Sequence, residues 1–112
     1  MTTSAKSLPY LREHGYLAQK VEQWNNFAHR RIDLYGCIDI VAIKDGEQGV
    51  LGVQATNMNE IDVHIDKAQN DCGVALKVWL KAGNKFEIHG WKGKEVEIVK
   101  LVIKNDLIMR GD

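Results

Sequence analysis

Two short apolar segments separated by a glycine-containing turn constrain the fold of this 112-residue chain more than any other feature. Residues 38–43 (IDIVAI) are apolar on both faces apart from Asp39, a pattern typical of a central strand covered on both sides. Residues 44–48 (KDGEQ) predict a turn, and residues 49–56 (GVLGVQAT) predict the returning strand. Antiparallel pairing about this turn would set Asp39 opposite Gln54 in an otherwise apolar hairpin.

The remaining segments predict helices around a mixed sheet. The first helix is expected over residues 4–14, starting near Ser7 with Pro9 in its first turn. A long helix is expected over 57–82, with Asn59 as its N-cap and a division at Gly73. Strands are expected over three further segments, with a loop between the first strand and the hairpin: strands 16–24, 85–91 and 95–103, and loop 25–37.

The predicted order is therefore helix, three strands, helix, two strands. This order predicts an α/β fold with a mixed β-sheet flanked by helices. A chain of 112 residues, of which 45% are apolar, is long enough for one domain spanning residues 1–112 and leaves little room for a second.

Charge and cysteine content narrow the class of function. Fifteen basic residues balance fifteen acidic ones, so net charge gives nucleic-acid binding no support. The compact basic cluster His29-Arg30-Arg31 can hold a phosphate or form a solvated loop. Cys37 and Cys72 lack CxxC spacing and are expected to be reduced core residues. With neither an apolar signal segment nor a membrane span in the sequence, we expect a cytoplasmic protein.

Polar side chains gather around the hairpin. Thr56 shares a strand face with Gln54, while Glu22 lies on the preceding strand and Asp33 in the segment entering Gly36. Carboxylate and amide oxygens are the ligands that magnesium prefers, so Glu22, Asp33, Asp39 and Gln54 are the candidate metal ligands. The alternative is structural: Asp39 caps the loop at Gly36 through backbone amides.

Residues 33–42 (DLYGCIDIVA) and 50–56 (VLGVQAT) resemble the PD-(D/E)xK nuclease superfamily. The first stretch also looks like the corresponding strand of Holliday-junction resolvases. Residues 21–25 (VEQWN), followed by 28–36, resemble small nuclease-like proteins of phage and bacterial genomes. The resemblance covers roughly residues 10 to 92.

The resemblance implies a restriction-endonuclease-like fold and a Mg²⁺- or Mn²⁺-dependent DNA endonuclease that hydrolyses phosphodiester bonds, with branched or junction DNA as a candidate substrate. Asp39 matches the metal-binding aspartate, and Gln54 matches the acidic position. Thr56 departs from the usual lysine, for which Lys20 or Lys67 can substitute, and Glu22 substitutes for the glutamate usual in the first helix. The small size of the chain indicates a homodimer on DNA.

Two alternatives to an active enzyme stay open. The first is a catalytically inactive nuclease-fold module that binds nucleic acid or a protein partner. The second is a subunit whose missing lysine is supplied by a partner.

Overall fold

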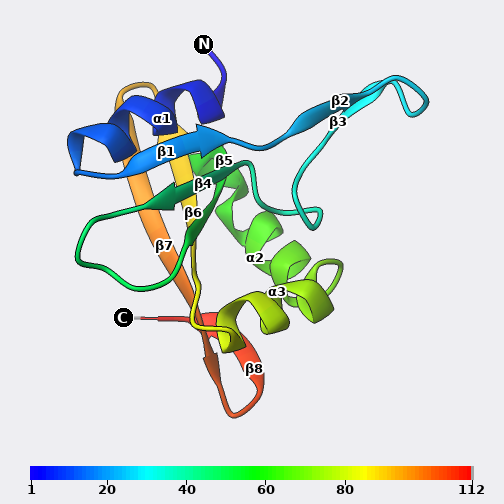
Figure 1. Cartoon of the computed structure of the whole chain (residues 1–112). Helices are drawn as coiled ribbons and strands as arrows, with labels where there is room; N and C mark the ends of the chain where they lie inside the picture. Colours follow the sequence, from blue (N-terminus) through cyan, green and yellow to red (C-terminus); the bar gives the residue numbers. More distant parts are fainter. Residues whose placement is uncertain (112) are drawn as a thin grey trace.

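A six-stranded sheet with helices on both faces forms the body of the protein, giving a mixed α/β fold (Figure 1). The structure is a computed structural model, and it describes residues 1–111. The elements are, in chain order, α1 (Thr3–Glu13), β1 (Leu17–Lys20), β2 (Gln23–Asn25), β3 (Arg30–Ile32), β4 (Ile40–Ile43), β5 (Leu51–Asn57), the 3-10 turn η1 (Met58–Glu60), α2 (Ile61–Gln69), α3 (Gly73–Lys81), β6 (Lys85–Lys92), β7 (Glu95–Lys104) and β8 (Leu107–Arg110).

The strands of the large sheet lie in the order β1-β4-β5-β6-β7-β8, while β2 and β3 pair in a small sheet of their own. Neighbouring strands are antiparallel except β5 and β6, which run parallel. Helices α2 and α3 carry the chain from β5 to β6, as a parallel connection requires. No helix within residues 1–111 is long and apolar enough to cross a membrane.

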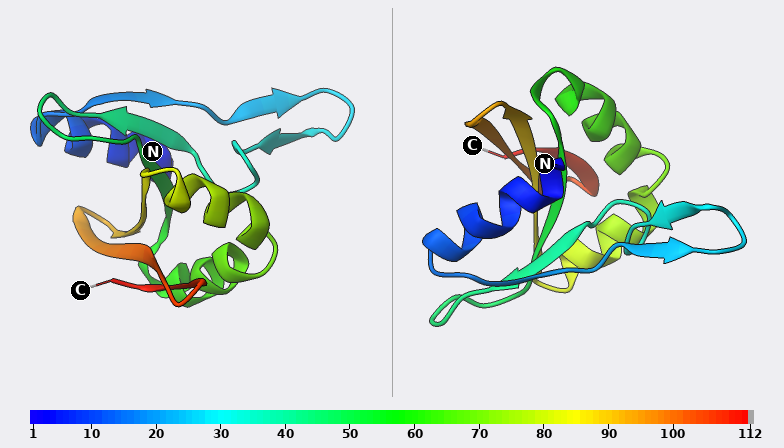
Figure 2. Two further views of the ribbon diagram at one scale, coloured as in Figure 1. Left: turned by 60° about the horizontal axis from the view of Figure 1, so that its bottom comes forward. Right: turned by 90° about the horizontal axis from the view of Figure 1, so that it is seen from above.

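Helix α1 covers one face of the sheet, over β1, β4 and β5 (Figure 2). The apolar side chains buried on this face are Leu11, Ala18, Ile40, Ala42, Leu51 and Val53. Alternate residues of β5 point to opposite faces, so Leu51 and Val53 face α1 while Gly52, Gln54 and Thr56 face α2 and α3. The alternation of side chains along β5 therefore places the polar residues Gln54 and Thr56 on the α2–α3 side of the sheet.

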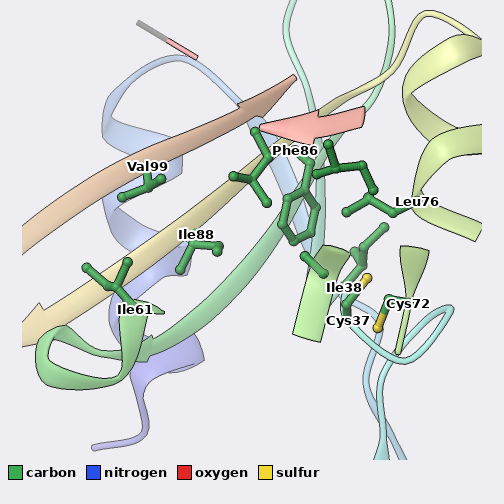
Figure 3. Close-up of a cluster of buried hydrophobic side chains, with 11 residues drawn as sticks. Cys37, Ile38, Ile61, Cys72, Leu76, Phe86, Ile88 and Val99 are labelled. Carbon is green, nitrogen blue, oxygen red and sulfur yellow. The ribbon is translucent and has the colours of Figure 1, made fainter. Parts of the chain in front are cut away.

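Helices α2 and α3 cover the other face and enclose the larger apolar core (Figure 3). Its buried residues are Cys37, Ile38, Ile61, Ala68, Cys72, Leu76, Phe86, Ile88, Val99, Leu101 and Ile108. Cys37 and Cys72 are free thiols in this core, as expected, and burial raises the pKa of the Cys37 thiol. Close packing needs glycine at position 90, where an added Cβ would lie 2.4 Å from Ile61 Cδ1.

A polar chain inside the α1 face joins the helix to β6. Trp91 Nε1 donates to Ser7 Oγ at 2.8 Å, and Ser7 Oγ lies 3.0 Å from His89 Nδ1. His89 Nε2 lies 3.1 Å from Glu87 Oε1. Because Ser7 accepts from the indole, its own proton is free for His89 Nδ1, which assigns the Nε2–H tautomer to a neutral His89. Both ring nitrogens of this buried histidine are satisfied.

Strands β2 and β3 form an arm that projects away from the body, in both Figure 1 and Figure 2. We define the arm as residues 23–32. It is inserted between β1 and β4, which pair with each other in the large sheet with Lys20 opposite Ile40. The arm therefore leaves and re-enters the body at one place.

The mixed α/β class with helices flanking the sheet is confirmed, but several predicted elements differ from the structure. The first helix begins at Thr3 with Thr2 as its N-cap, so Pro9 lies inside the helix rather than in its first turn. Residues 16–24 form two strands instead of one, because the backbone of Val21 leaves the sheet after donating to the Asp39 carbonyl oxygen at 2.8 Å.

The loop predicted over residues 25–37 contains β3, and β8 was not predicted at all. The predicted N-cap Asn59 lies within η1, and α2 follows Glu60 instead. The division of the long helix at Gly73 is confirmed, since α3 begins there.

Candidate functional site

Asp39 and Gln54 face each other across the predicted hairpin, which is formed by β4 and β5. The β4–β5 ladder pairs Ile40 with Val53, and its next step sets Asp39 opposite Gln54, as predicted. Gln54 Nε2 donates to Asp39 Oδ2 at 3.0 Å, and the Ala55 N–H donates to the same oxygen at 2.8 Å. Both side chains are buried. The carboxylate thus accepts from a backbone amide, as the structural alternative expects, but that amide belongs to Ala55 of β5 and not to the loop at Gly36.

Three carboxylates converge at this point. One oxygen each from Glu22, Asp33 and Asp39 lies within 4.8 Å of the other two. Glu22 follows β1, Asp33 follows β3, and Asp39 precedes β4, so three segments of backbone bring them together. The backbone at Asp39 is held on both sides, by its N–H to the Val53 carbonyl and by its carbonyl to the Val21 N–H. We call Glu22, Asp33 and Asp39 the acidic cluster.

Burial raises the pKa of Asp39 to about 8, and a hydrogen bond with the Asp33 side chain adds to this shift. The negative charges of Asp33 and Glu22 act in the same direction, while the Ala55 N–H acts against them. A carboxyl with this pKa is largely protonated at neutral pH when no cation is near. Loss of the Asp39 proton would therefore place three carboxylates close together, an arrangement that a bound cation would stabilise.

The amide of Gln54 leaves one polar atom unsatisfied. Its Oε1 is buried and has no hydrogen-bond partner among the described residues. A buried acceptor without a partner costs about 1–3 kcal/mol. A half-turn of the amide would exchange Oε1 and Nε2 and direct an oxygen toward the acidic cluster. With the amide in that orientation, the Gln54 oxygen and the three carboxylates would form a ligand set for a hard divalent cation such as Mg²⁺ or Mn²⁺.

Two cations border the acidic cluster through Glu22. Lys20 Nζ lies 2.9 Å from Glu22 Oε1, and Arg31 Nη1 lies 3.7 Å from the same oxygen. Ser4 Oγ, in the first turn of α1, also donates to it at 3.4 Å. Of the two lysines considered from the sequence, Lys20 is the one that forms an ion pair with the cluster.

Thr56 has its hydrogen-bond partner outside this arrangement, and Lys67 forms no ion pair with the acidic cluster in the part of the chain that the structure describes. Thr56 is buried on the same face of β5 as Gln54, but its Oγ1 donates to Glu60 Oε2 at 3.3 Å. Lys67, on α2, acts instead on His64, whose pKa is lowered first by burial and then by the Lys67 charge. His64 is half-buried, with Nδ1 lacking a hydrogen-bond partner among the described residues.

The basic cluster His29-Arg30-Arg31 lies at the start of β3, the second strand of the arm. His29 lies in the turn between the strands, while Arg30 and Arg31 are in β3, and all three are exposed. Sequence reasoning placed them in a loop before the site and did not connect them with Tyr35, while Trp24 was considered either a core residue or part of a partner surface. The adjacent Asn25 and Asn26 are the turn signal from which such a hairpin could have been found.

The structure thus gathers Lys20, Glu22, Asp33, Asp39, Gln54 and Arg31 at the base of the arm. It holds Thr56 to one side of them and Lys67 on α2. Comparisons of the chain with known protein families, with curated proteins and with solved structures found no match.

Proposed function

We propose that the protein is a divalent-metal-dependent endonuclease that hydrolyses phosphodiester bonds in DNA. The observation that supports this most is the acidic cluster, with three carboxylate oxygens within 4.8 Å of one another and the Gln54 amide bonded to one of its members, Asp39. Such a set of hard oxygen donors is typical of sites that hold Mg²⁺ or Mn²⁺ near a phosphate.

Each residue of the site has a separate part in the proposed reaction. Glu22, Asp33, Asp39 and Gln54 hold the cation, which when bound supplies positive charge to the phosphate oxygens. Burial of Asp39 excludes water from one side of the site and strengthens its electrostatic interactions. Asp39, with its pKa raised to about 8, must lose its proton before it can act as a ligand.

Lys20 is the proposed substitute for the lysine that Thr56 replaces. Its ammonium group lies 2.9 Å from Glu22 Oε1 and is only partly exposed. A cation at this position can offset the charge that develops on the phosphate. Thr56, bonded to Glu60, is then a structural residue of the β5 end.

The partners and location follow from the same proposal. Arg30, Arg31 and His29 provide phosphate contacts on the arm, next to the acidic cluster. A homodimer stays a prediction from the small size of the chain, and sedimentation in the presence and absence of DNA tests it. Action on DNA inside the cell places the protein in the cytoplasm.

The test is cleavage of plasmid, linear duplex, single-stranded and four-way-junction DNA, with Mg²⁺ or Mn²⁺ against EDTA. We compare the wild type with Asp39→Asn, and with Asp45→Asn as a control from the exposed β4–β5 turn. Metal-dependent cutting that Asp39→Asn abolishes and Asp45→Asn retains is the expected result. DNA binding in EDTA without cutting under any condition would instead favour the inactive nuclease-fold module.

A further inference from the structure

The arm carries aromatic side chains that have no part in the folded core. Phe27 at its tip is 97% exposed, and Trp24 on β2 is 57% exposed. Neither belongs to one of the two apolar cores, whose members lie outside residues 23–32. Large apolar groups held out in solvent on a projecting strand pair indicate a surface that contacts a partner.

The charge of the arm indicates what kind of partner this is. Residues 23–32 contain Arg30, Arg31 and His29 and no aspartate or glutamate, whereas the whole chain has a net charge of zero. Positive charge interleaved with exposed aromatic rings complements the phosphates and bases of a nucleic acid. A protein partner could be recognised by apolar contacts alone, and it would not require a segment that has basic residues and no acidic ones.

The register of the arm directs one face toward the acidic cluster. Trp24 pairs with Arg31 across the strands, so the two side chains share a face. Arg31 Nη1 lies 3.7 Å from Glu22 Oε1, at the base of the arm. A strand of nucleic acid lying along this face would therefore reach the acidic cluster.

A hollow of about 350 Å³ opens at the same base. The residues that line it include Gln23, Trp24, Asn25, Asp33 and Tyr35. The volume lies within the range of small-ligand sites, and flat rings with amide groups suit a nucleobase. Asp33 belongs both to this hollow and to the acidic cluster, so the two are adjacent.

We propose that the arm and the hollow bind single-stranded nucleic acid, with one unpaired base in the hollow between Trp24 and Tyr35. Phe27 stacks on a second base at the tip of the arm, and Arg31 contacts a phosphate. Bases within a duplex keep their faces stacked on each other, so only an unpaired segment can use these rings. The choice of nucleic acid as occupant rests on the proposed nuclease function, to which it adds a substrate class.

The test measures binding of fluorescein-labelled oligo(dT), oligo(U) and a blunt duplex of equal length by fluorescence anisotropy. EDTA is present throughout, so binding is measured without cleavage. The wild type should bind the single strands more tightly than the duplex, and a preference between oligo(dT) and oligo(U) separates DNA from RNA as the source. Trp24→Ala and Phe27→Ala should each lower affinity by about 5- to 150-fold, the usual cost of losing one stacked base.

Matched controls separate the arm from the rest of the surface. Leu107→Ala removes an apolar side chain that is 59% exposed at the β7–β8 turn, and it should leave binding unchanged. Arg31→Ala should weaken binding, while Arg110→Ala should not. These two arginine side chains are 59% and 58% exposed, and each lies within 4.0 Å of a glutamate.

Equal affinity of Trp24→Ala, Phe27→Ala and the wild type would overturn the proposal, as would tighter binding to duplex. Self-association that needs Trp24 and Phe27, without binding of either oligonucleotide, would overturn it too and make the arm an interface between two copies. Asp39→Asn should bind single strands like the wild type. If the wild type cuts no DNA but Trp24→Ala loses binding, the binding role of the arm is supported and the nuclease function is rejected. If the protein cuts single strands and Trp24→Ala leaves KM unchanged, the nuclease function is supported and the binding role of the arm is rejected.

Discussion

Gln54 lies opposite Asp39 across the β4–β5 pair, and its Nε2 donates to Asp39 Oδ2 at 3.0 Å. Gln54→Glu replaces this donor with a second carboxylate. In EDTA at pH 8 the free energy of unfolding should fall by about 1–3 kcal/mol, the cost of a lost buried hydrogen bond. Added Mg²⁺ or Mn²⁺ should stabilise the variant more than the wild type, because the ligand set has gained a charge.

Urea denaturation with EDTA and with each metal measures both effects. Gln19→Glu, on the exposed side of β1, is the matched control and should show neither effect. Equal stabilisation of Gln54→Glu and the wild type by metal would show that Gln54 is not a ligand.

The stability of the metal-free protein should depend on the ionisation of Asp39. Burial raises its pKa from the ordinary 3.8 to about 8. Between these values the native state keeps a proton that the unfolded state releases, so this group's contribution to the free energy of unfolding falls as pH rises. Urea denaturation in EDTA at pH 5 and pH 8 should show a wild-type decrease that Asp39→Asn lacks. Parallel pH profiles for the two proteins would contradict the raised pKa.

Lys20 forms an ion pair with the acidic cluster, whereas Lys67 forms none among the described residues, and cleavage rates should separate the two. Lys20→Met removes the ammonium group that lies 2.9 Å from Glu22 Oε1. If Lys20 offsets charge on the phosphate, kcat should drop by about 10²-fold or more. Lys67→Met, on α2, should change kcat little. A loss confined to Lys67→Met would move the catalytic cation to the helix, and no loss in either variant would favour a lysine supplied by a partner.

Ser7 supports two buried polar groups, and its removal should be costly. Ser7→Ala leaves Trp91 Nε1 and His89 Nδ1 without their partner. Each unpaired buried group costs about 1–3 kcal/mol, so the free energy of unfolding should fall by several kcal/mol. Ser4→Ala, also buried in α1 but bonded only at 3.4 Å, should cost less. Chemical denaturation of the two variants side by side makes the comparison, and equal losses would exclude the assigned hydrogen-bond chain.

Gly90 allows η1 and α2 to lie close to β6, and a methyl group there should be harmful. An added Cβ would lie 2.4 Å from Ile61 Cδ1 and 3.1 Å from Met58 Cα. Gly90→Ala should therefore lower the free energy of unfolding by about 1–3 kcal/mol, as overpacking commonly does. Gly73→Ala, where the nearest atom lies at 3.8 Å, is the control measured by the same thermal denaturation. Equal Tm values for Gly90→Ala and the wild type would show that the contact relaxes freely.

The pairing of Asp39 with Gln54 could be predicted because it depends on local information. A short turn links two apolar strands, and the number of turn residues determines which residues face each other. Glu22 and Asp33 were also named in advance, from their order along the chain. Their convergence depends on the arm returning the chain to its starting point, which no periodic pattern in the sequence records.

Other features depend on tertiary contacts. Residues 16–24 alternate like one strand, and Val21 keeps to that alternation by packing on the α2–α3 core, yet the chain leaves the sheet after Lys20 to form the arm. Thr56 could not be assigned a partner, because Glu60 reaches it from the next element. Strand β8 was within reach of sequence reasoning, since Asn105 and Asp106 both adopt positive φ and form a turn that favours such residues.

In the arm, the residues that would bind a partner are different from the residues that stabilise the fold. Its side chains contribute nothing to either core, so substitutions in residues 24–31 should leave the stability of the body nearly unchanged. Its two ends nevertheless adjoin Glu22 and Asp33. Mutations in the arm alone can therefore change substrate preference during evolution. The fold and the acidic cluster would be unaffected by such mutations.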